Sequence, residues 1–285
     1  LSLHDALPIY DDEVKHFLEK RSIENSKKHQ QPATLNVKSN LDKLTLNDMQ
    51  VFRFNFRHEK NQKILYLHGG YNTLQPSPFH WRLLDKLTLN TLHEVVLPIY
   101  PKSPDYHYLE TFKAIRDVYN QLVEEVGADN IVMMGDGSGG GLALSFVQSL
   151  INDNQEVPRK LFLLSPLLDA TLTNPNITQT LEENDILVSR FGVHQLMKSW
   201  TNDLPLSDAR ISPLYGTLKG LPPIYMYGGG REILSPDMHA FTHALEECGN
   251  DVEFKEYPKM VHDFPIYPIR QSHKVLKHIT KSILE

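Results

Sequence analysis

The segment from residue 135 to residue 141 reads Gly-Asp-Gly-Ser-Gly-Gly-Gly and carries a serine in a setting suited to a nucleophile. It follows the apolar run Ile131 to Met134 and precedes the helix-like stretch Leu142 to Ile151. A sharp turn between a strand and a helix exposes its central side chain, and flanking glycines leave room for it. The N–H groups that open the helix are free to hold a developing negative charge. Ser138 is therefore the candidate nucleophile.

The spacing differs by one position from the nucleophile motif G-x-S-x-G, because Asp136 stands two residues before Ser138. Two arrangements are open. In the first, the turn shifts by one residue, Ser138 takes the exposed position and Asp136 fills a place that normally has no side chain. In the second, Gly137 takes the exposed position and no hydroxyl group is presented.

Three glycines of the same segment, Gly135, Gly137 and Gly140, also satisfy the dinucleotide fingerprint G-x-G-x-x-G. That fingerprint requires an acidic residue for the ribose at the end of the next strand. The next strand ends at Leu164 and Ser165, where no acid stands. Dinucleotide binding is the least favoured interpretation of the segment.

An acid and a histidine follow two later strands. Glu232 comes just after the apolar run Ile224 to Tyr227, and His262 follows the strand-like run Val252 to Tyr257. The chain order serine, acid, histidine, each after its own strand, is the order of a Ser-His-acid triad on a parallel sheet. Asp237 is the alternative acid, but its place at the start of a predicted helix favours a helix N-terminal carboxylate.

These residues need a sheet to position them, and the pattern of the chain predicts one. Short apolar runs alternate with segments of helical period, which predicts an α/β fold with a mainly parallel central sheet flanked by helices. The predicted strands are 51–56, 64–67, 94–99, 131–134, 161–164, 224–227 and 252–257. The predicted helices are 79–89, 108–126, 142–151, 238–248 and 271–284.

The ends and one insertion of the chain stand apart from this alternation. Residues 1–9 resemble a translated sequencing adapter and are excluded from the fold prediction. Residues 10–40 are expected to form a helix and a connector, with the helix at Asp11 to Ser26. Residues 41–285 are expected to form the α/β domain, and a polar, helical insertion at about 174–208 is placed where it would cover the ligand site as a lid.

Composition narrows the class of protein. The 285 residues carry a formal charge of -6 without a basic stripe, which argues against nucleic acid or an anionic membrane surface as a partner. No apolar run is long enough to span a bilayer, and the single cysteine, Cys248, cannot form an internal disulfide. A cytoplasmic location and a small-molecule substrate are expected. No metal-ligand spacing such as H-E-x-x-H or C-x-x-C is present, so a metal site is not predicted.

Together these strings resemble the hormone-sensitive-lipase-like family of α/β-hydrolases, which contains acetyl esterases and carboxylesterases. Residues 66–70, Tyr-Leu-His-Gly-Gly, are similar to its H-G-G-G segment, and residues 135–140 are similar to its G-D-S-A-G-G elbow. Residues 232–234, Glu-Ile-Leu, and 257–264, Tyr-Pro-Lys-Met-Val-His-Asp-Phe, are similar to its acid and histidine segments. An ungapped alignment of the elbow puts Gly137 at the nucleophile and Ser138 at the alanine that follows it.

The resemblance implies an α/β-hydrolase domain whose helical lid is made from the helix at Asp11 to Ser26 and the insertion at Asn174 to Asp208. It also implies hydrolysis of small carboxylic esters without a cofactor. Ser138 would attack, His262 would take its proton and Glu232 would orient the imidazole. The N–H groups of Gly70, Tyr71 and Gly139 would hold the oxyanion. Tyr71 replaces the third glycine of H-G-G-G. If Gly137 occupies the elbow instead, the resemblance implies a catalytically inactive binding protein of the same fold.

Overall fold

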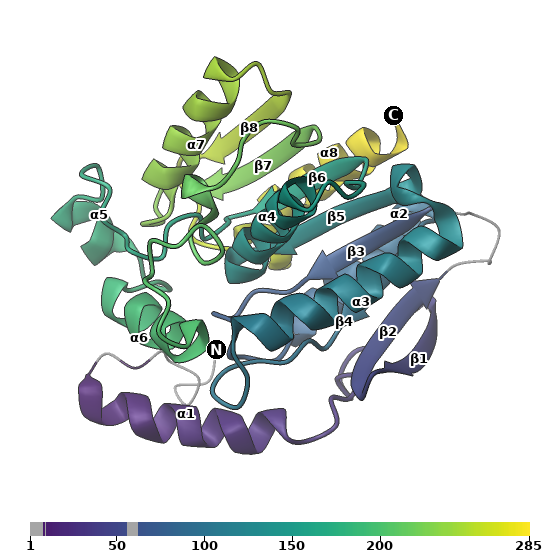
Figure 1. The fold of residues 1–285 in the computed structure, drawn as a ribbon, viewed down its shortest axis with the longest axis horizontal. Helices are drawn as coiled ribbons and strands as arrows, with labels where there is room; N and C mark the ends of the chain where they lie inside the picture. The colour runs from purple at the N-terminus through teal and green to yellow at the C-terminus, as the bar shows by residue number, and fades with distance from the viewer. Residues whose placement is uncertain (1–7, 9, 56–61) are drawn as a thin grey trace.

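One eight-stranded sheet organises the chain (Figure 1). The computed structural model describes residue 8, residues 10–55 and residues 62–285. The strand order is β1-β2-β4-β3-β5-β6-β7-β8; β2 pairs antiparallel with β1 and with β4, and the remaining neighbours are parallel. The strands are β1 (Asn40–Leu46), β2 (Met49–Asn55), β3 (Lys63–Leu67), β4 (Glu94–Pro98), β5 (Ile131–Asp136), β6 (Lys160–Leu164), β7 (Ile224–Gly229) and β8 (Val252–Tyr257).

Helices cover both faces of this sheet, because alternate strand residues are apolar on both sides. Trp81 and Leu84 of α2 (Pro78–Thr91) and Ile279 of α8 (Arg270–Leu284) belong to the core on one face. The opposite core contains Ile115 and Phe146. It is built by α3 (Tyr108–Val126), α4 (Gly137–Asn152) and α7 (Ser235–Glu247). The predicted α/β architecture with a mainly parallel, helix-flanked sheet is confirmed.

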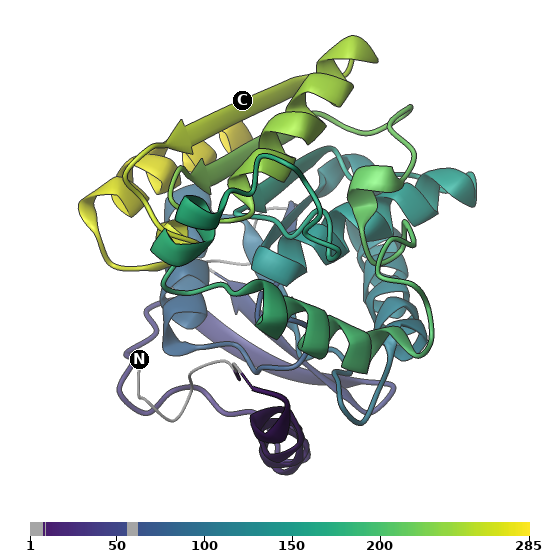
Figure 2. The same cartoon turned by 90° about the vertical axis from the view of Figure 1, so that its left-hand side faces the viewer.

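The carboxyl ends of the parallel strands meet at one edge, where ligands bind in sheets of this kind. Three helices lie beside that edge (Figures 1 and 2): α1 (Asp11–Asn25), α5 (Gln179–Asn184) and α6 (Arg190–Thr201). The Nδ2 group of Asn25 donates to the carbonyl oxygen of Thr73 at 2.9 Å. Ser199 of α6 shares a hydrogen bond of 2.6 Å with Ser103, Oγ to Oγ. Both predicted helical segments therefore contact loops that leave the sheet at this edge.

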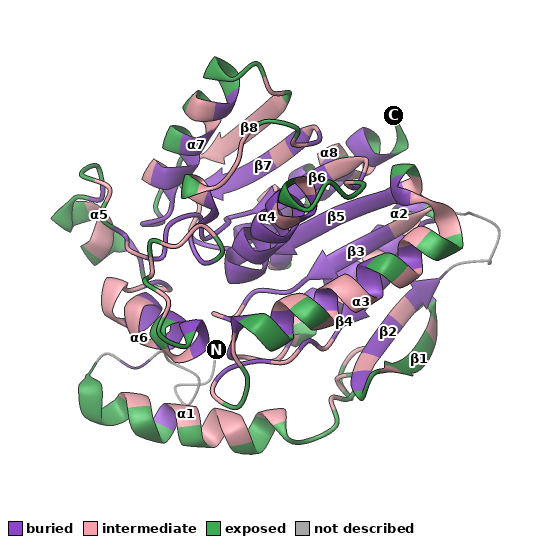
Figure 3. Cartoon of the chain, in the orientation of Figure 1, coloured by how far each residue is buried: buried purple, intermediate pink, exposed green. Residues whose placement is uncertain are grey.

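Three differences from the sequence-based expectation have physical reasons. Helix α4 begins at Gly137 instead of Leu142, because the glycines form its first turn. Strand β1 was not expected; it is an edge strand with mostly exposed side chains (Figure 3), so its apolar signal is weak. Strand β2 runs from Met49, two residues before the expected start, and the expected last residue, Phe56, lies outside the described residues.

The adapter-like segment also lies outside the described residues, apart from Pro8. Across the part of the chain that the structure describes, none of the helices combines the length and apolar character needed to cross a membrane.

Candidate active site

The acid and the histidine predicted from the sequence lie together at the carboxyl edge of the sheet. His262 Nδ1 and Glu232 Oε2 are 2.8 Å apart, and Glu232 is fully buried. The second carboxylate oxygen, Oε1, accepts hydrogen bonds from Ser165 Oγ at 2.8 Å and from the backbone N–H of Gly229. A buried carboxylate held on both oxygens fixes the imidazole beside it and favours the Nδ1–H form.

Asp237, the alternative acid, has a different partner. Its Oδ1 accepts a hydrogen bond of 2.9 Å from Nδ2 of Asn174, and burial raises its pKa to about 6. It opens helix α7, as the helix N-terminal interpretation expects. The structure therefore brings Glu232, and not Asp237, into contact with His262.

A second carboxylate occupies the other side of the imidazole. Asp263 Oδ2 lies 3.1 Å from His262 Nε2, the nitrogen that a catalytic histidine turns toward its nucleophile. Burial alone lowers the pKa of His262, but the charges and hydrogen bonds of Asp263 and Glu232 outweigh it, so the pKa lies well above its ordinary value. Burial in turn raises the pKa of Asp263 to about 6. This arrangement favours the protonated, imidazolium form of the histidine.

Gly137 occupies the elbow position of the strand-to-helix turn. Its φ of +51° lies in the left-handed region that non-glycine residues rarely adopt. A Cβ atom built on Gly137 would lie 3.4 Å from His262 Nε2 and 3.1 Å from Asp263 Oδ2. A side chain at residue 137 would therefore point at the imidazole. This is the second of the two arrangements that the sequence leaves open.

Two close backbone contacts fix the register of that turn. A Cβ atom on Gly135 would collide with the carbonyl oxygens of Gly139 and Leu67. One on Gly139 would collide with the carbonyl oxygens of Leu67 and His68. Shifting the turn by one residue would move Asp136 into the place of Gly135, where there is no room for its side chain. The glycine pattern therefore opposes the shift that Ser138 needs to reach the elbow.

Hydrogen bonds of the Asp136 side chain stabilise the same register of the turn. Its Oδ1 accepts a hydrogen bond of 2.6 Å from the hydroxyl of Tyr66, and its Oδ2 lies 3.0 Å from Nε2 of His80. All three side chains are buried. Burial raises the pKa of Asp136, but His80 and Tyr66 outweigh it and the net pKa is lowered. Moving this carboxylate would leave buried partners without their charge-assisted hydrogen bonds.

Ser138, the predicted nucleophile, lies one position past the elbow and faces elsewhere. Its Oγ accepts a long hydrogen bond of 3.3 Å from the backbone N–H of Asn72. Among the described residues, the imidazole of His262 contacts the carboxylates of Glu232 and Asp263 and not the hydroxyl of Ser138. The catalytic role of Ser138 stays a prediction, and the resting geometry does not favour it.

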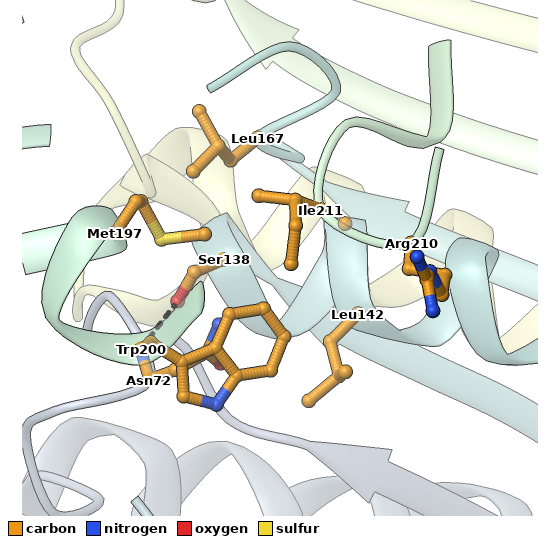
Figure 4. A pocket seen from close by; sticks show the side chains of 9 residues that line it. Asn72, Ser138, Leu142, Leu167, Met197, Trp200, Arg210 and Ile211 are labelled. Atoms are coloured by element: carbon orange, nitrogen blue, oxygen red, sulfur yellow. Dashed lines mark hydrogen bonds between the residues drawn. The ribbon is translucent and has the colours of Figure 1, made fainter. Parts of the chain in front are cut away.

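The Ser138 side chain lines a narrow pocket (Figure 4). The cavity there is only about 10 Å³, close to the space of one water molecule. Its wall is mostly apolar. The other lining residues are Asn72, Gly141, Leu142, Leu167, Met197, Trp200, Arg210 and Ile211.

The glycine turn after β3 has the backbone expected of an anion-binding loop. Gly70, Tyr71 and Asn72 have φ values of +119°, +57° and +52°. Successive residues with unusual φ values turn N–H groups outward. Gly139 lies in the first turn of α4, whose N–H groups have no intrahelical partner. The donor roles of Gly70, Tyr71 and Gly139 remain predictions, but both segments face the site from the expected elements.

Two residues of the site were missed in the sequence. Asp263 directly follows His262 in the sequence, and this adjacency was the only indication that it belongs to the site. Ser165 ends the apolar strand β6 with a polar side chain, which is a recognisable signal for the carboxyl edge. Within the described residues, no group of three or more histidine, cysteine, aspartate or glutamate side chains is arranged to hold a metal ion.

Comparison with known proteins agrees with this architecture. A family model described as the alpha/beta hydrolase fold matches residues 64–266. An esterase of Acinetobacter venetianus is 34% identical over 208 residues, which are 72% of this chain and 68% of the relative. A triacylglycerol lipase of Mycobacterium tuberculosis is 29% identical over 77% of this chain, which spans only 46% of that protein.

Solved structures give the same result. A crystal structure described as a candidate esterase from Staphylococcus aureus has 62% identity and a TM-score of 0.98, covering 100% of this chain and 97% of the other. An esterase from the bacterial hormone-sensitive lipase family superposes with a TM-score of 0.82 at 20% identity, covering 97% and 99% of the two chains. At that identity the second likeness shows the fold alone.

Proposed function

Because this chain belongs to the α/β-hydrolase fold family and resembles its hormone-sensitive-lipase-like group, we propose that it binds small carboxylic esters and hydrolyses them slowly by general-base catalysis. The observation that carries the proposal is the buried Glu232–His262 pair, 2.8 Å apart, which faces a left-handed turn that presents no side chain. The esterase relatives supply the substrate class.

In the proposed reaction, His262 Nε2 takes a proton from a water molecule above Gly137, and the water oxygen attacks the ester carbonyl carbon. The resulting oxyanion is held by N–H groups of Gly70, Tyr71 and the first turn of α4 at Gly139. The tetrahedral intermediate collapses, the bond from carbon to the alkoxy oxygen breaks, and Nε2 returns its proton to the leaving alkoxide. Glu232 stabilises the imidazolium throughout.

The base must be neutral for this reaction, and Asp263 opposes that. Its carboxylate stabilises the imidazolium form of His262. It also accepts a hydrogen bond from Nε2, which is the nitrogen that must take the proton from water in the proposed reaction. We therefore expect hydrolysis to be slow at neutral pH and to increase as the solution becomes alkaline, because a raised pKa moves deprotonation of His262 upward.

The acyl side of the substrate is expected to be small. The pocket beside Ser138 has a free volume of about 10 Å³ and is closed by Leu142, Met197 and Trp200. A volume of that size is close to the space of one water molecule, so the pocket leaves little room for a long acyl chain. Acetyl esters are therefore the proposed substrates, and a series of p-nitrophenyl esters of increasing acyl length should show a steep fall after acetate.

A second candidate function is ester binding without turnover. The position of Asp263 Oδ2 favours it, because this oxygen lies 3.1 Å from His262 Nε2 and 3.1 Å from where a side chain on Gly137 would begin. It thus fills the space beside the imidazole that a nucleophile would use. A protein with this site held closed would bind the ester but leave it intact.

One experiment separates these possibilities and the Ser138 mechanism. The protein is incubated with p-nitrophenyl acetate and, separately, with a fluorophosphonate probe followed by mass mapping. Turnover that is lost in His262→Gln but kept in Ser138→Ala, without probe labelling, is the expected result. Labelling of Ser138 would instead establish the shifted elbow. Absence of turnover at any pH in folded protein would exclude hydrolysis, and calorimetric binding of the intact ester to that protein would then support the second function.

A further inference from the structure

A second and much larger cavity, of about 930 Å³, lies outside the site just described. It is bordered by the end of α1, the turn between β1 and β2, and the start of α3. Its floor is the segment 99–102, which follows β4. His262, Glu232 and Gly137 do not line it.

Lys102 in this floor is buried without an anionic partner. Its residue is 3% exposed, and its Nζ donates to the carbonyl oxygen of Tyr100 at 2.8 Å and lies 4.5 Å from the centre of the Tyr100 ring. No carboxylate of the described residues forms an ion pair with it. Burial lowers its pKa to about 7. Lysine is rarely buried without a pair, so a bound anion would relieve this cost.

Two residues that line the same cavity each have a buried acceptor atom. Oδ1 of Asn25 and Oε1 of Gln75 have no hydrogen-bond partner among the described residues. The orientation of the Asn25 amide is fixed, because its Nδ2 donates to the carbonyl oxygens of Thr73 at 2.9 Å and Ser103 at 3.2 Å. Buried amide oxygens normally have a donor, so each of these two is available to accept a hydrogen bond from a bound group.

We propose that this cavity binds a small hydroxy- or amino-carboxylate. The ligand carboxylate lies on Nζ of Lys102. A ligand hydroxyl group donates to Oε1 of Gln75, and a ligand ammonium group donates to the amide oxygens of both Asn25 and Gln75. The site is separate from the ester site and does not depend on the function proposed for it.

The acidic residues of the cavity wall do not compete for Lys102, because three of them are engaged elsewhere. Asp105 accepts from Ser22 Oγ at 2.7 Å, and Glu110 accepts from the backbone N–H of His107 at 3.0 Å. Asp117 is paired with Lys113 at 2.7 Å. The fourth, Asp48, lies in the turn between β1 and β2.

Calorimetric titration of the whole chain with L-lactate tests the proposal, with lactamide as the uncharged control. At about pH 8 Lys102 is mostly neutral, and a carboxylate on Nζ should draw a proton onto it, giving an uptake of about one proton per bound lactate. The other titratable groups that face Lys102 are Tyr100, His29 and His68. The two histidines stay neutral at that pH, since burial and the charge of Lys102 lower their pKa values. Repeating the titration in HEPES and in Tris measures the uptake.

Three variants make the outcome decisive. Lys102→Met should abolish lactate binding, whereas Lys102→Arg should bind lactate without proton uptake, because arginine stays charged. Gln75→Leu should reduce the preference for lactate over acetate. If Lys102→Met does not fold, the arginine variant alone carries the test. Equal binding of lactamide, no binding of lactate at millimolar concentration, or proton uptake that persists in Lys102→Arg would overturn the proposal.

Discussion

The two halves of the candidate active site differ in which functional groups they contain. The base half, Glu232 and His262, has its side chains, their spacing and their buried support. The nucleophile half contains the left-handed turn and the helix start. The residue at the turn is Gly137, which has no side-chain oxygen that could attack a substrate. The comparison teaches that the backbone of a catalytic elbow is set by close packing of glycines and not by the reactive atom.

Completing the nucleophile half should give the largest effect. Gly137→Ser places a hydroxymethyl group toward His262 Nε2, where a Cβ atom has 3.4 Å of separation. We expect hydrolysis of p-nitrophenyl acetate to rise by at least about a hundredfold, with a burst of product and fluorophosphonate labelling at residue 137. Stopped-flow absorbance and mass mapping measure both.

The matched control is Gly137→Ala, which adds the Cβ atom without the hydroxyl. It should show neither burst nor labelling. If the serine and alanine variants hydrolyse the ester at the same rate while both remain folded, the interpretation of residue 137 as the nucleophile position is wrong.

Removing the anchor of the nucleophile half should give the next largest effect, on stability. Asp136→Ala leaves His80 and Tyr66 buried without their acceptor, and we expect a loss of about 3 kcal/mol in the free energy of unfolding. Urea denaturation followed by circular dichroism measures it. The carboxylate has a lowered pKa, so its contribution is present above the unfolded-state value of 3.8 and is lost as the pH falls through the folded-state pKa.

The stability difference between the wild type and Asp136→Ala should accordingly shrink in acid. A difference that stays constant down to about pH 2 would show that packing, and not the charge of Asp136, holds the turn.

A smaller effect is expected from removing the carboxylate of Asp263 beside His262. Asp263→Asn removes a carboxylate that stabilises the imidazolium, so the pKa of His262 should fall and the pH profile of ester hydrolysis should move to lower pH. At neutral pH the rate should rise roughly several-fold, because a larger fraction of His262 is neutral. Initial rates across a pH series measure this, and a profile unchanged by the substitution would remove Asp263 from the account of slow turnover.

The smallest effect is expected at the residue that the sequence pattern singled out first. Ser138→Ala removes one long hydrogen bond from Asn72 and keeps the backbone N–H. Ester hydrolysis should stay within about twofold of the wild type, and stability should fall by about 1 kcal/mol or less. A loss of activity as large as that of His262→Gln would instead place Ser138 at the reacting atoms.

Sequence patterns predicted the fold well where burial is one-sided or complete. Strands β5 and β6 and helix α3 have uniform apolar runs or a clear stripe, and their predicted bounds agree with the structure to within two residues. Strand β1 escaped prediction because an exposed edge strand needs no apolar alternation. Helix α4 was shortened because four glycines have no helical signal of their own.

For the site, chain order predicted the pairing of Glu232 with His262, which their hydrogen bond now shows. The choice between Gly137 and Ser138 at the elbow could not be made from the motif. It depends on contacts of Gly135 and Gly139 with carbonyl oxygens of β3 and the loop that follows it, and such contacts have no signature along the chain. The contact between Asp263 and Nε2 of His262 likewise depends on the three-dimensional fold and could not be predicted from the sequence.

The glycine at the elbow has a consequence for the backbone strain, and so for the stability, of the folded chain. A side chain held at a φ of +51° costs on the order of 1 to 3 kcal/mol, a strain that active enzymes carry for the sake of reactivity. Gly137 adopts the same angle without that strain. The turn at residue 137 is therefore relaxed, and a serine placed there would bring that strain with it and lower the stability of the folded chain by a comparable amount.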